Sequence, residues 1–297
     1  MIVITVGKSY IDIDGYASSI AYRELLRLKG IESKFVSNAT VNYSIIDSLK
    51  SNYTVDNYLV NSNDKYIVLD LSDKSYFPDF VDENNIIEII DHHPGYEDYW
   101  NSKIGCNALI EPIGSVATII VEKYEQDNLL DKMNKDVAML LMAAILDNTL
   151  NFTANITTER DKEAYKKLEV LINEYDYASK YFSECQKYIE DNLKESIDND
   201  IKIQKVSEHL PNVFGQLTIW NADDLLRQKD LINQIMSNYN NEWMLNIISL
   251  NNNSSYIMYS GDSVKNKLVE LLDCKEENGI LIKTPAMLRK EIIKKAL

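Results

Sequence analysis

Short apolar runs alternate with helical patterns through the first half of this chain, and this alternation restricts the fold more than any other feature. The apolar runs are short, rich in β-branched residues and typical of buried strands; they span residues 1–6, 33–37, 66–69 and 86–90. Apolar side chains recur at helical spacing in residues 16–28, 116–124 and 137–146. Strands that alternate with helices form a parallel sheet covered on both faces, so the sequence predicts an α/β domain.

Acidic residues and two histidines follow these predicted strands and helices. They are Asp12, Asp14, Asp70, Asp91, His92, His93 and Asp147. Each aspartate alone is more typical of a turn or a helix N-cap. Together, at the carboxyl edge of one sheet, they would repel one another unless a cation lay between them. The pattern predicts a site for two divalent ions, manganese or magnesium, with the Asp70 carboxylate bridging both.

Two of the three histidines are consecutive, and they are predicted to have different roles. From a turn, one of His92 and His93 can bind a metal while the other faces the substrate, and an imidazole beside the site can protonate a leaving oxygen. His209 lies in a polar turn and is interpreted as a surface residue.

The second half predicts a smaller α/β domain. A long helix is expected over residues 164–193, and the polar residues 196–200 are interpreted as a break between domains. The predicted division is a metal-binding catalytic domain at 1–190, a linker at 191–200 and a substrate-binding domain at 201–297. Beyond the break, strands are expected at 214–220, 244–250 and 256–259, and helices at 222–239 and 284–297.

The charge balance excludes some classes of partner. With 31 basic and 46 acidic residues the net charge is −15, which opposes binding to long nucleic acid or to an anionic membrane. A small phosphorylated substrate stays compatible, because a metal ion can supply positive charge locally. Three cysteines in no CxxC pair, and no apolar stretch of membrane-spanning length, predict a soluble, cytoplasmic protein.

Several motifs occur in an order that resembles the DHH phosphoesterase family, and more narrowly the manganese-dependent family II inorganic pyrophosphatases. The naming motif is Asp91-His92-His93-Pro94, preceded by a first motif from Gly7 to Asp14 and by Val68-Leu69-Asp70. Later blocks at residues 111–118, 143–149 and 157–161 also resemble the family. In the second half, the similar segments are residues 200–202, 215–217 and 288–290, so the likeness spans nearly the whole chain.

This resemblance implies two domains that close over a phosphoanhydride, with the active site in the cleft between them. It implies Mn²⁺ or Mg²⁺, one or two ions per chain, and a homodimer formed through the first domain. The implied metal ligands are Asp12, Asp14, Asp70, His92 and Asp147, and His93 is the implied substrate-facing histidine. Lys202, Arg289 and Lys290 match the cations that hold phosphate.

Two positions depart from the family pattern. The first motif of the family has a metal-binding histidine after the glycine, where this chain has Lys8, whose ammonium cannot bind a metal. Lys8 either fills part of the metal site and pairs with Asp12 or Asp70, turns outward to touch substrate phosphate, or is a solvated surface residue. Glu291 places an anion where the resemblance implies a cation, which should weaken the grip on pyrophosphate.

These patterns lead to one main functional hypothesis and two alternatives. The main one is a metal-dependent phosphohydrolase that cleaves pyrophosphate or short polyphosphate by attack of a metal-activated water. Lys8 and Glu291 motivate the first alternative, a weakly active or inactive paralogue that binds a phosphorylated ligand. The second alternative is a phosphodiesterase acting on small nucleotides.

Overall fold

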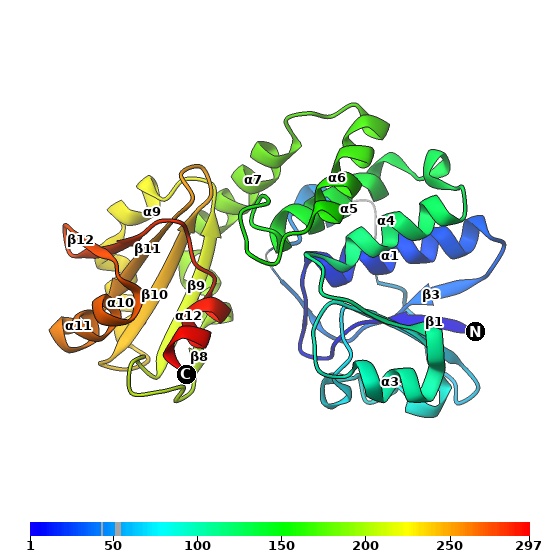
Figure 1. The fold of residues 1–297 in the computed structure, drawn as a ribbon, viewed down its shortest axis with the longest axis horizontal. Coiled ribbons are helices and arrows are strands. Elements are labelled where there is room, and N and C mark those ends of the chain that lie inside the picture. The colour runs from blue at the N-terminus through cyan, green and yellow to red at the C-terminus, as the bar shows by residue number, and fades with distance from the viewer. Residues whose placement is uncertain (43, 51–54) are drawn as a thin grey trace. The chain divides into compact units, whose positions relative to one another are not determined.

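The structure is a computed structural model that describes residues 1–42, 44–50 and 55–297. It divides into two compact units, Met1–Ala178 and Ser179–Leu297 (Figure 1). The predicted pair of α/β domains is therefore confirmed, although the units meet earlier in the chain than the predicted linker at 191–200. Residues 193–200 are not a turn-like break: they form helix α8 (Leu193–Asp200).

The first unit contains the predicted parallel sheet. Its strand order is β3-β1-β5-β6-β7, and every neighbouring pair is parallel. The strands are β1 (Ile2–Thr5), β3 (Ser33–Phe35), β5 (Lys65–Leu69), β6 (Ile86–Asp91) and β7 (Ala108–Ile110). A separate two-stranded pair joins β2 (Tyr10–Ile11) to β4 (Thr40–Val41). Because β1, β5 and β6 are neighbours in the sheet, the loops that follow them meet at one edge.

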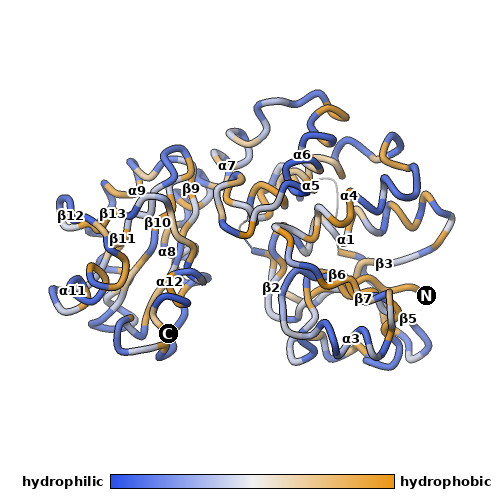
Figure 2. The backbone as a smooth tube through the Cα atoms, viewed as in Figure 1, coloured by the Kyte–Doolittle hydropathy of each residue, from blue (hydrophilic) through white to orange (hydrophobic). Residues whose placement is uncertain are grey.

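Helices cover both faces of this sheet, as the apolar strand pattern predicts. Figure 1 shows α1 (Ile13–Leu28), α4 (Val116–Gln126) and α5 (Lys135–Asn148) on one side and α3 (Glu97–Ile104) on the other. Trp100 of α3 is fully buried and packs in a cluster with Val3, Val68 and Ile89 from three strands. Figure 2 shows the hydrophobic colouring of β1 and β6. The unit also contains α2 (Asp47–Lys50), α6 (Glu159–Ile172) and the 3₁₀ turns η1 (Lys74–Tyr76), η2 (Glu83–Asn85), η3 (Gly105–Asn107) and η4 (Leu130–Lys132).

The single helix predicted over residues 164–193 is wrong, because the segment is divided between α6, α7 (Tyr177–Asp191) and α8. Helix α6 starts earlier, at a capping box between Thr158 and Asp161. It ends at Asn173, which adopts the left-handed conformation with φ 54°. Asn192 leaves the helical region between α7 and α8, with ψ 41°. Apolar periodicity continues across both breaks, so it did not reveal them.

The second unit is built on a mixed sheet with strand order β12-β13-β11-β10-β9-β8. The central pair β9 (Val213–Ile219) and β10 (Trp243–Ser249) is parallel, and the other pairs are antiparallel. The remaining strands are β8 (Lys202–Ile203), β11 (Ser254–Tyr259), β12 (Lys275–Glu277) and β13 (Ile280–Lys283). The predicted strands at 214–220, 244–250 and 256–259 match β9, β10 and β11 within two residues.

The helices of the second unit differ from prediction in their bounds. The helix expected at 222–239 is two helices, α9 (Asp223–Arg227) and α10 (Lys229–Ser237), separated at Gln228. The C-terminal helix α12 (Arg289–Ala296) begins later than residue 284, because the preceding loop is held on β11: Met287 N donates to Ser255 Oγ over 2.9 Å. Helix α11 (Gly261–Leu272) was not predicted.

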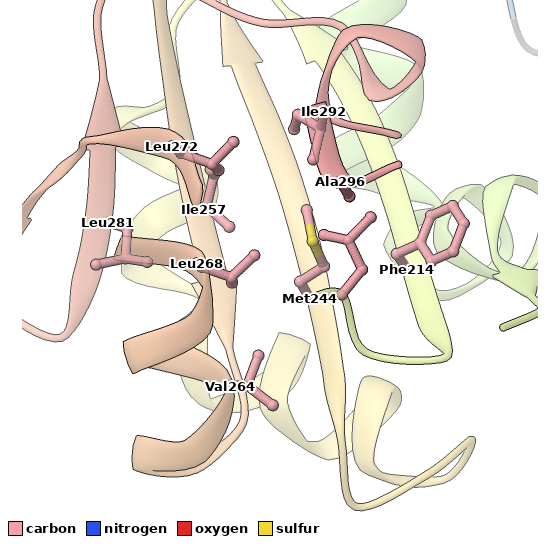
Figure 3. Close-up of a cluster of buried hydrophobic side chains, with 10 residues drawn as sticks. Phe214, Met244, Ile257, Val264, Leu268, Leu272, Leu281, Ile292 and Ala296 are labelled. Carbon is pink, nitrogen blue, oxygen red and sulfur yellow. The ribbon is translucent and has the colours of Figure 1, made fainter. Parts of the chain in front are cut away.

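Leu268 of α11 and Ile292 of α12 pack with Met244 and Phe214 of the sheet (Figure 3). Among the described residues, no helix is both long and apolar enough to cross a membrane.

Candidate metal centre

Asp70, His92 and His93 come together at the carboxyl edge of the first unit's sheet. Asp70 follows β5, and the two histidines follow the neighbouring strand β6. Each of the three offers one ligand atom, and these atoms all lie within 4.8 Å of one another. This is the one group of metal-ligand type found by that criterion in residues 1–42, 44–50 and 55–297.

Asp70 is held in a conformation that aspartate rarely adopts. Its φ is 58°, in the left-handed region, a placement that costs roughly 1–3 kcal/mol for a residue with a side chain. Its N–H donates to Ile90 O over 2.8 Å, which ties β5 to the strand that carries the histidines. Its Oδ1 is buried and has no hydrogen-bond partner in the described part of the chain. An orphaned buried carboxylate oxygen fits a site for a cation.

His92 is oriented so that one ring nitrogen faces Asp70. Its Nδ1 lies 3.0 Å from the carbonyl oxygen of Ile113. A carbonyl oxygen can only accept, so Nδ1 carries the hydrogen and Nε2 of the neutral ring keeps its lone pair. That Nε2 lies 3.4 Å from Asp70 Oδ1. A metal-binding histidine commonly has this arrangement, with its second nitrogen donating to a carbonyl group.

His93 is held by Asp91, the last residue of β6. Asp91 Oδ1 accepts from His93 Nδ1 over 2.8 Å and from the N–H groups of His92 and His93 over 2.8 and 3.2 Å. Burial alone would raise the pKa of Asp91, but the hydrogen bonds and the charge of His93, together with a hydrogen bond to Ser72, outweigh burial and lower it. Desolvation lowers the pKa of His93, but the hydrogen bond to Asp91 and the charge of Asp70 raise it above its usual value. The hydrogen bond to Asp91 therefore holds the His93 ring in place, and the side chain of His93 is exposed.

Asp12 lies next to Asp70 and is also the N-cap of α1. Its Oδ1 accepts from Gly15 N over 3.1 Å. A Cβ at Gly15 would lie 3.5 Å from Asp70 Oδ2 and 3.7 Å from Asp12 Oδ1, so both carboxylates lie beside the same glycine. Burial raises the pKa of Asp70 well above its usual value, and the charges of Asp12 and Asp14 raise it further. A bound cation would remove this electrostatic cost.

Asp14 is fully buried, and its carboxylate caps the start of α4. Its Oδ1 accepts from Ser115 Oγ over 2.9 Å and from Ala117 N over 3.0 Å. Its Oδ2 accepts from Val116 N over 2.9 Å. Burial raises the pKa of Asp14, while the charge of His92 opposes that rise. Asp14 therefore lies beside the centre but outside the group of three ligand atoms.

The remaining predicted residues of the first unit are not in the group of three ligand atoms. Asp147 is half-buried near the end of α5. Lys8 is exposed; its N–H donates to Tyr76 O over 2.9 Å, and its Nζ lies 3.6 Å from Asp79 Oδ1. In the described part of the chain, no ion pair joins Lys8 to Asp12 or Asp70, so the alternative in which it fills the metal site is not observed.

The predicted phosphate-holding cations belong to the second unit. Lys202 is exposed in β8, and Arg289 begins α12, where its guanidinium pairs with Asp200. Lys290 is the next residue of α12, and its side chain lies outside the described part. Glu291 Oε2 accepts from Leu288 N over 2.7 Å, so this anion helps to start the helix.

Some residues that shape the centre were missed by sequence reasoning. The carbonyl oxygen of Ile113 orients His92, and no side-chain pattern signals a backbone contact. Asp161 is fully buried, and its Oδ2 accepts from Gly114 N over 3.1 Å. A Cβ at Gly114 would lie 2.6 Å from that oxygen, so only glycine fits there. The spacing from Thr158 to Asp161 is a capping-box signal that could have identified this aspartate.

Comparison with known proteins agrees with this geometry. Residues 2–145 match the model of the DHH family, N-terminal domain. A Bacillus licheniformis protein described as a manganese-dependent inorganic pyrophosphatase is 30% identical over 57% of this chain, and the match spans 55% of that protein's length. A protein of the same description from Streptococcus thermophilus is 24% identical over 98% of this chain and 96% of its own.

The fold is also found among solved structures. A Methanococcus jannaschii protein described as a family II inorganic pyrophosphatase superposes with a TM-score of 0.65, at 21% identity, over 100% of this chain and 99% of its own. At that identity the likeness establishes the fold. The ordered motifs, the sheet edge with its aspartates and histidines, and the matches along the chain agree. The chain carries a DHH-family N-terminal domain and is a homologue of the manganese-dependent inorganic pyrophosphatases.

Proposed function

We propose that this protein is a metal-dependent phosphohydrolase that cleaves a phosphoanhydride, either pyrophosphate or short polyphosphate. The observation that carries the proposal is the buried, unpartnered Asp70 Oδ1 that faces His92 Nε2 at 3.4 Å. Carboxylate oxygen together with imidazole nitrogen suits manganese, and magnesium is the alternative. The names of the homologues support the same metal and substrate class.

The residues fit such an ion, and we assign their roles accordingly. Asp70 and His92 would hold it, with Asp12, Asp14 and Asp147 as the further ligands that the resemblance implies. When bound, a divalent cation neutralises phosphate charge and makes water a stronger nucleophile. Lys202, Arg289 and Lys290 stay predicted phosphate contacts, and the homodimer and the cytoplasmic location stay predictions.

His93 is the group we assign as general acid. Its Nδ1 is bound to Asp91, so Nε2 is the nitrogen that can give a proton to the leaving phosphate oxygen. Asp91 Oδ1 holds the ring through Nδ1 and also accepts from the backbone N–H groups of His92 and His93. The upward pKa shift of His93 keeps the ring protonated at higher pH. In this proposal His92 binds the metal and His93 faces the substrate.

Phosphate release from pyrophosphate and tripolyphosphate, with Mn²⁺ or Mg²⁺, tests the proposal. Asp70→Asn should remove the activity and weaken metal binding measured by calorimetry. Asp47→Asn is the matched control, because Asp47 is exposed in α2 and pairs with Lys50 of the same helix. No phosphate release from either substrate by protein that holds its metal would contradict the proposal.

Lys8 supports one second candidate, a phosphate-ligand-binding paralogue with little turnover. Its exposed ammonium stands where the resemblance implies a metal ligand, so the centre has one donor fewer. Pyrophosphate that binds tightly and is recovered intact after hours with the metal-loaded protein would favour this candidate.

A further inference from the structure

The second unit contains a closed ring of hydrogen bonds among Asp200, Gln216 and Arg289, which lie on three different elements. Gln216 N, in β9, donates to Asp200 Oδ2 over 2.5 Å. Arg289 N, at the start of α12, donates to Gln216 Oε1 over 2.6 Å. Arg289 Nη1 donates to Asp200 O over 3.0 Å and also to Asp200 Oδ2. The ring fixes both the backbone and the guanidinium of Arg289.

Only one nitrogen of the guanidinium is used by the ring. Nη1 makes both contacts with Asp200, and Nε and Nη2 have no partner in the described part of the chain. The Arg289 side chain is 26% exposed, so part of it is reachable from solvent. A guanidinium edge with two free N–H donors matches two oxygens of a phosphate group.

Lys202 adds a second positive charge near Arg289. Lys202 is exposed and close enough to Asp200 for its charge to act on that carboxyl group. Asp200 is the one carboxylate in the ring, and its charge is already engaged by Arg289 and by Gln216 N. Burial raises the pKa of Asp200, while the charge of Arg289 opposes that rise.

The loop before Arg289 is also fixed to the sheet. Asn246 is fully buried, and its Nδ2 donates to Met287 O over 2.7 Å. Ser255 is fully buried, and its Oγ accepts from Met287 N over 2.9 Å. The start of α12 therefore cannot shift without breaking buried hydrogen bonds.

We propose that Asp200 and Gln216 are positioning residues that hold the Arg289 guanidinium ready to bind a phosphate group. This inference rests on the proposed function, because it assumes that the protein binds a phosphoanhydride. An arginine left free would lose side-chain entropy when it became ordered on a ligand. Holding it before binding reduces that cost, which is the general benefit of preorganisation.

The effect of Asp200→Asn on binding affinity distinguishes positioning from simple electrostatics, because the two explanations predict opposite changes. Asp200→Asn removes a negative charge near the anion, so electrostatics alone predicts tighter binding. If Asp200 acts by orienting Arg289, the same substitution should weaken binding by about fivefold. The probe is imidodiphosphate, a pyrophosphate analogue with a nitrogen bridge, and calorimetry in one Mg²⁺ buffer measures its affinity.

A double-mutant cycle separates positioning from a merely structural role. In the Arg289→Ala background, Asp200→Asn should cause no further weakening, because the group that it orients is gone. Asp198→Asn is the matched control in the same helix, where Asp198 pairs with Lys194 and accepts from Tyr239 Oη. It should leave the affinity unchanged. Gln216→Met removes the acceptor for Arg289 N and should also weaken binding, which keeps the test available if Asp200→Asn fails to fold.

Three outcomes would overturn the proposal: unchanged or tighter binding in Asp200→Asn, weakening that persists in the Arg289→Ala background, or no binding of imidodiphosphate by the wild-type protein. The proposed function is tested separately by phosphate release. Binding that follows the predicted pattern without any hydrolysis would refute the hydrolase and keep the positioning role. Hydrolysis with an unaffected Asp200→Asn variant would do the reverse.

Discussion

Ser115 Oγ donates a 2.9 Å hydrogen bond to Asp14 Oδ1, joining residues 101 positions apart in a fully buried contact. Asp14 lies in the first turn of α1, Ser115 caps α4, and the Ile113 carbonyl that orients His92 lies two residues before Ser115. This contact therefore links the first acidic motif to the loop that aligns a predicted metal ligand.

Ser115→Ala should lower the free energy of unfolding by roughly 2 kcal/mol, because it removes a hydrogen bond to a buried carboxylate and the N-cap of α4. Urea unfolding measures the change. Ser18→Ala is the control, since Ser18 Oγ reaches the same Asp14 oxygen over a longer 3.3 Å. A cost for Ser115→Ala no larger than that for Ser18→Ala would show that the contact does not support α4.

Asp70→Asn should stabilise the metal-free protein at pH 7 by about 1–2 kcal/mol, because it removes a buried charge beside Asp12 and Asp14. The pKa of Asp70 is raised in the folded state, so the native protein holds a proton that the unfolded chain releases near pH 4. The free energy of unfolding of the wild-type protein should therefore fall as pH rises from about 4 through the folded-state pKa of Asp70. The stability difference between Asp70→Asn and wild type should disappear at low pH.

Unfolding in EDTA and in Mn²⁺ checks this expectation. Metal should stabilise the wild-type protein and leave Asp70→Asn nearly unchanged. An Asp70→Asn variant that is less stable than wild type in EDTA at pH 7 would contradict the electrostatic account.

Lys8→His should increase Mn²⁺ affinity or the number of ions bound per chain, because it adds an imidazole at the position where the resemblance implies a ligand. Elemental analysis and calorimetry give both values. Lys8→Gln is the control, since it removes the ammonium and the ion pair with Asp79 without adding a good metal donor. Equal metal binding in the two variants would mean that the position 8 side chain does not reach the centre.

Glu83 should contribute pH-dependent stability outside the metal centre. Hydrogen bonds from Lys103 and Tyr99 lower the pKa of Glu83 below its usual 4.5. The folded pKa is depressed, so the contribution is present above pH 4.5 and is lost as pH falls through the folded value. Glu83→Gln should cost up to about 1 kcal/mol at pH 7 and less at pH 3, measured by urea unfolding.

Glu159→Gln serves as the comparison for Glu83, because Glu159 is 80% exposed and pairs with Lys162 one helical turn away. It should change stability little at either pH. A cost of Glu83→Gln that stays constant between pH 7 and pH 3 would argue against the ionised contact.

The aspartates and histidines of the centre were predictable because strand ends follow directly from local pattern. Runs of apolar residues locate β5 and β6, and the parallel sheet then brings Asp70 and His92 to one edge. The placement of the Lys8 side chain was harder to predict, because the sequence allowed three alternatives. Its contact with Asp79 depends on how the loops after β1 and β5 meet.

The sequence analysis missed elements whose bounds are not marked by a change in the local apolar pattern, or that are too short to produce such a pattern. The breaks at Asn173 and Asn192 interrupt an apolar pattern that continues through them, and β7 has only three residues. Helix α12 starts late because Asn246 and Ser255, both far away in sequence, hold the loop before it.

The sequence by itself determined the parallel sheet, the acidic residues at its edge and the likeness to the family, because periodicity and residue order are local properties. Tertiary structure alone decided which nitrogen of His92 faces Asp70, that both Asp14 oxygens cap α4, and that Asp200 and Gln216 hold Arg289. These are hydrogen bonds between residues distant in sequence or to backbone carbonyl groups, and such bonds are defined only when the chain is folded.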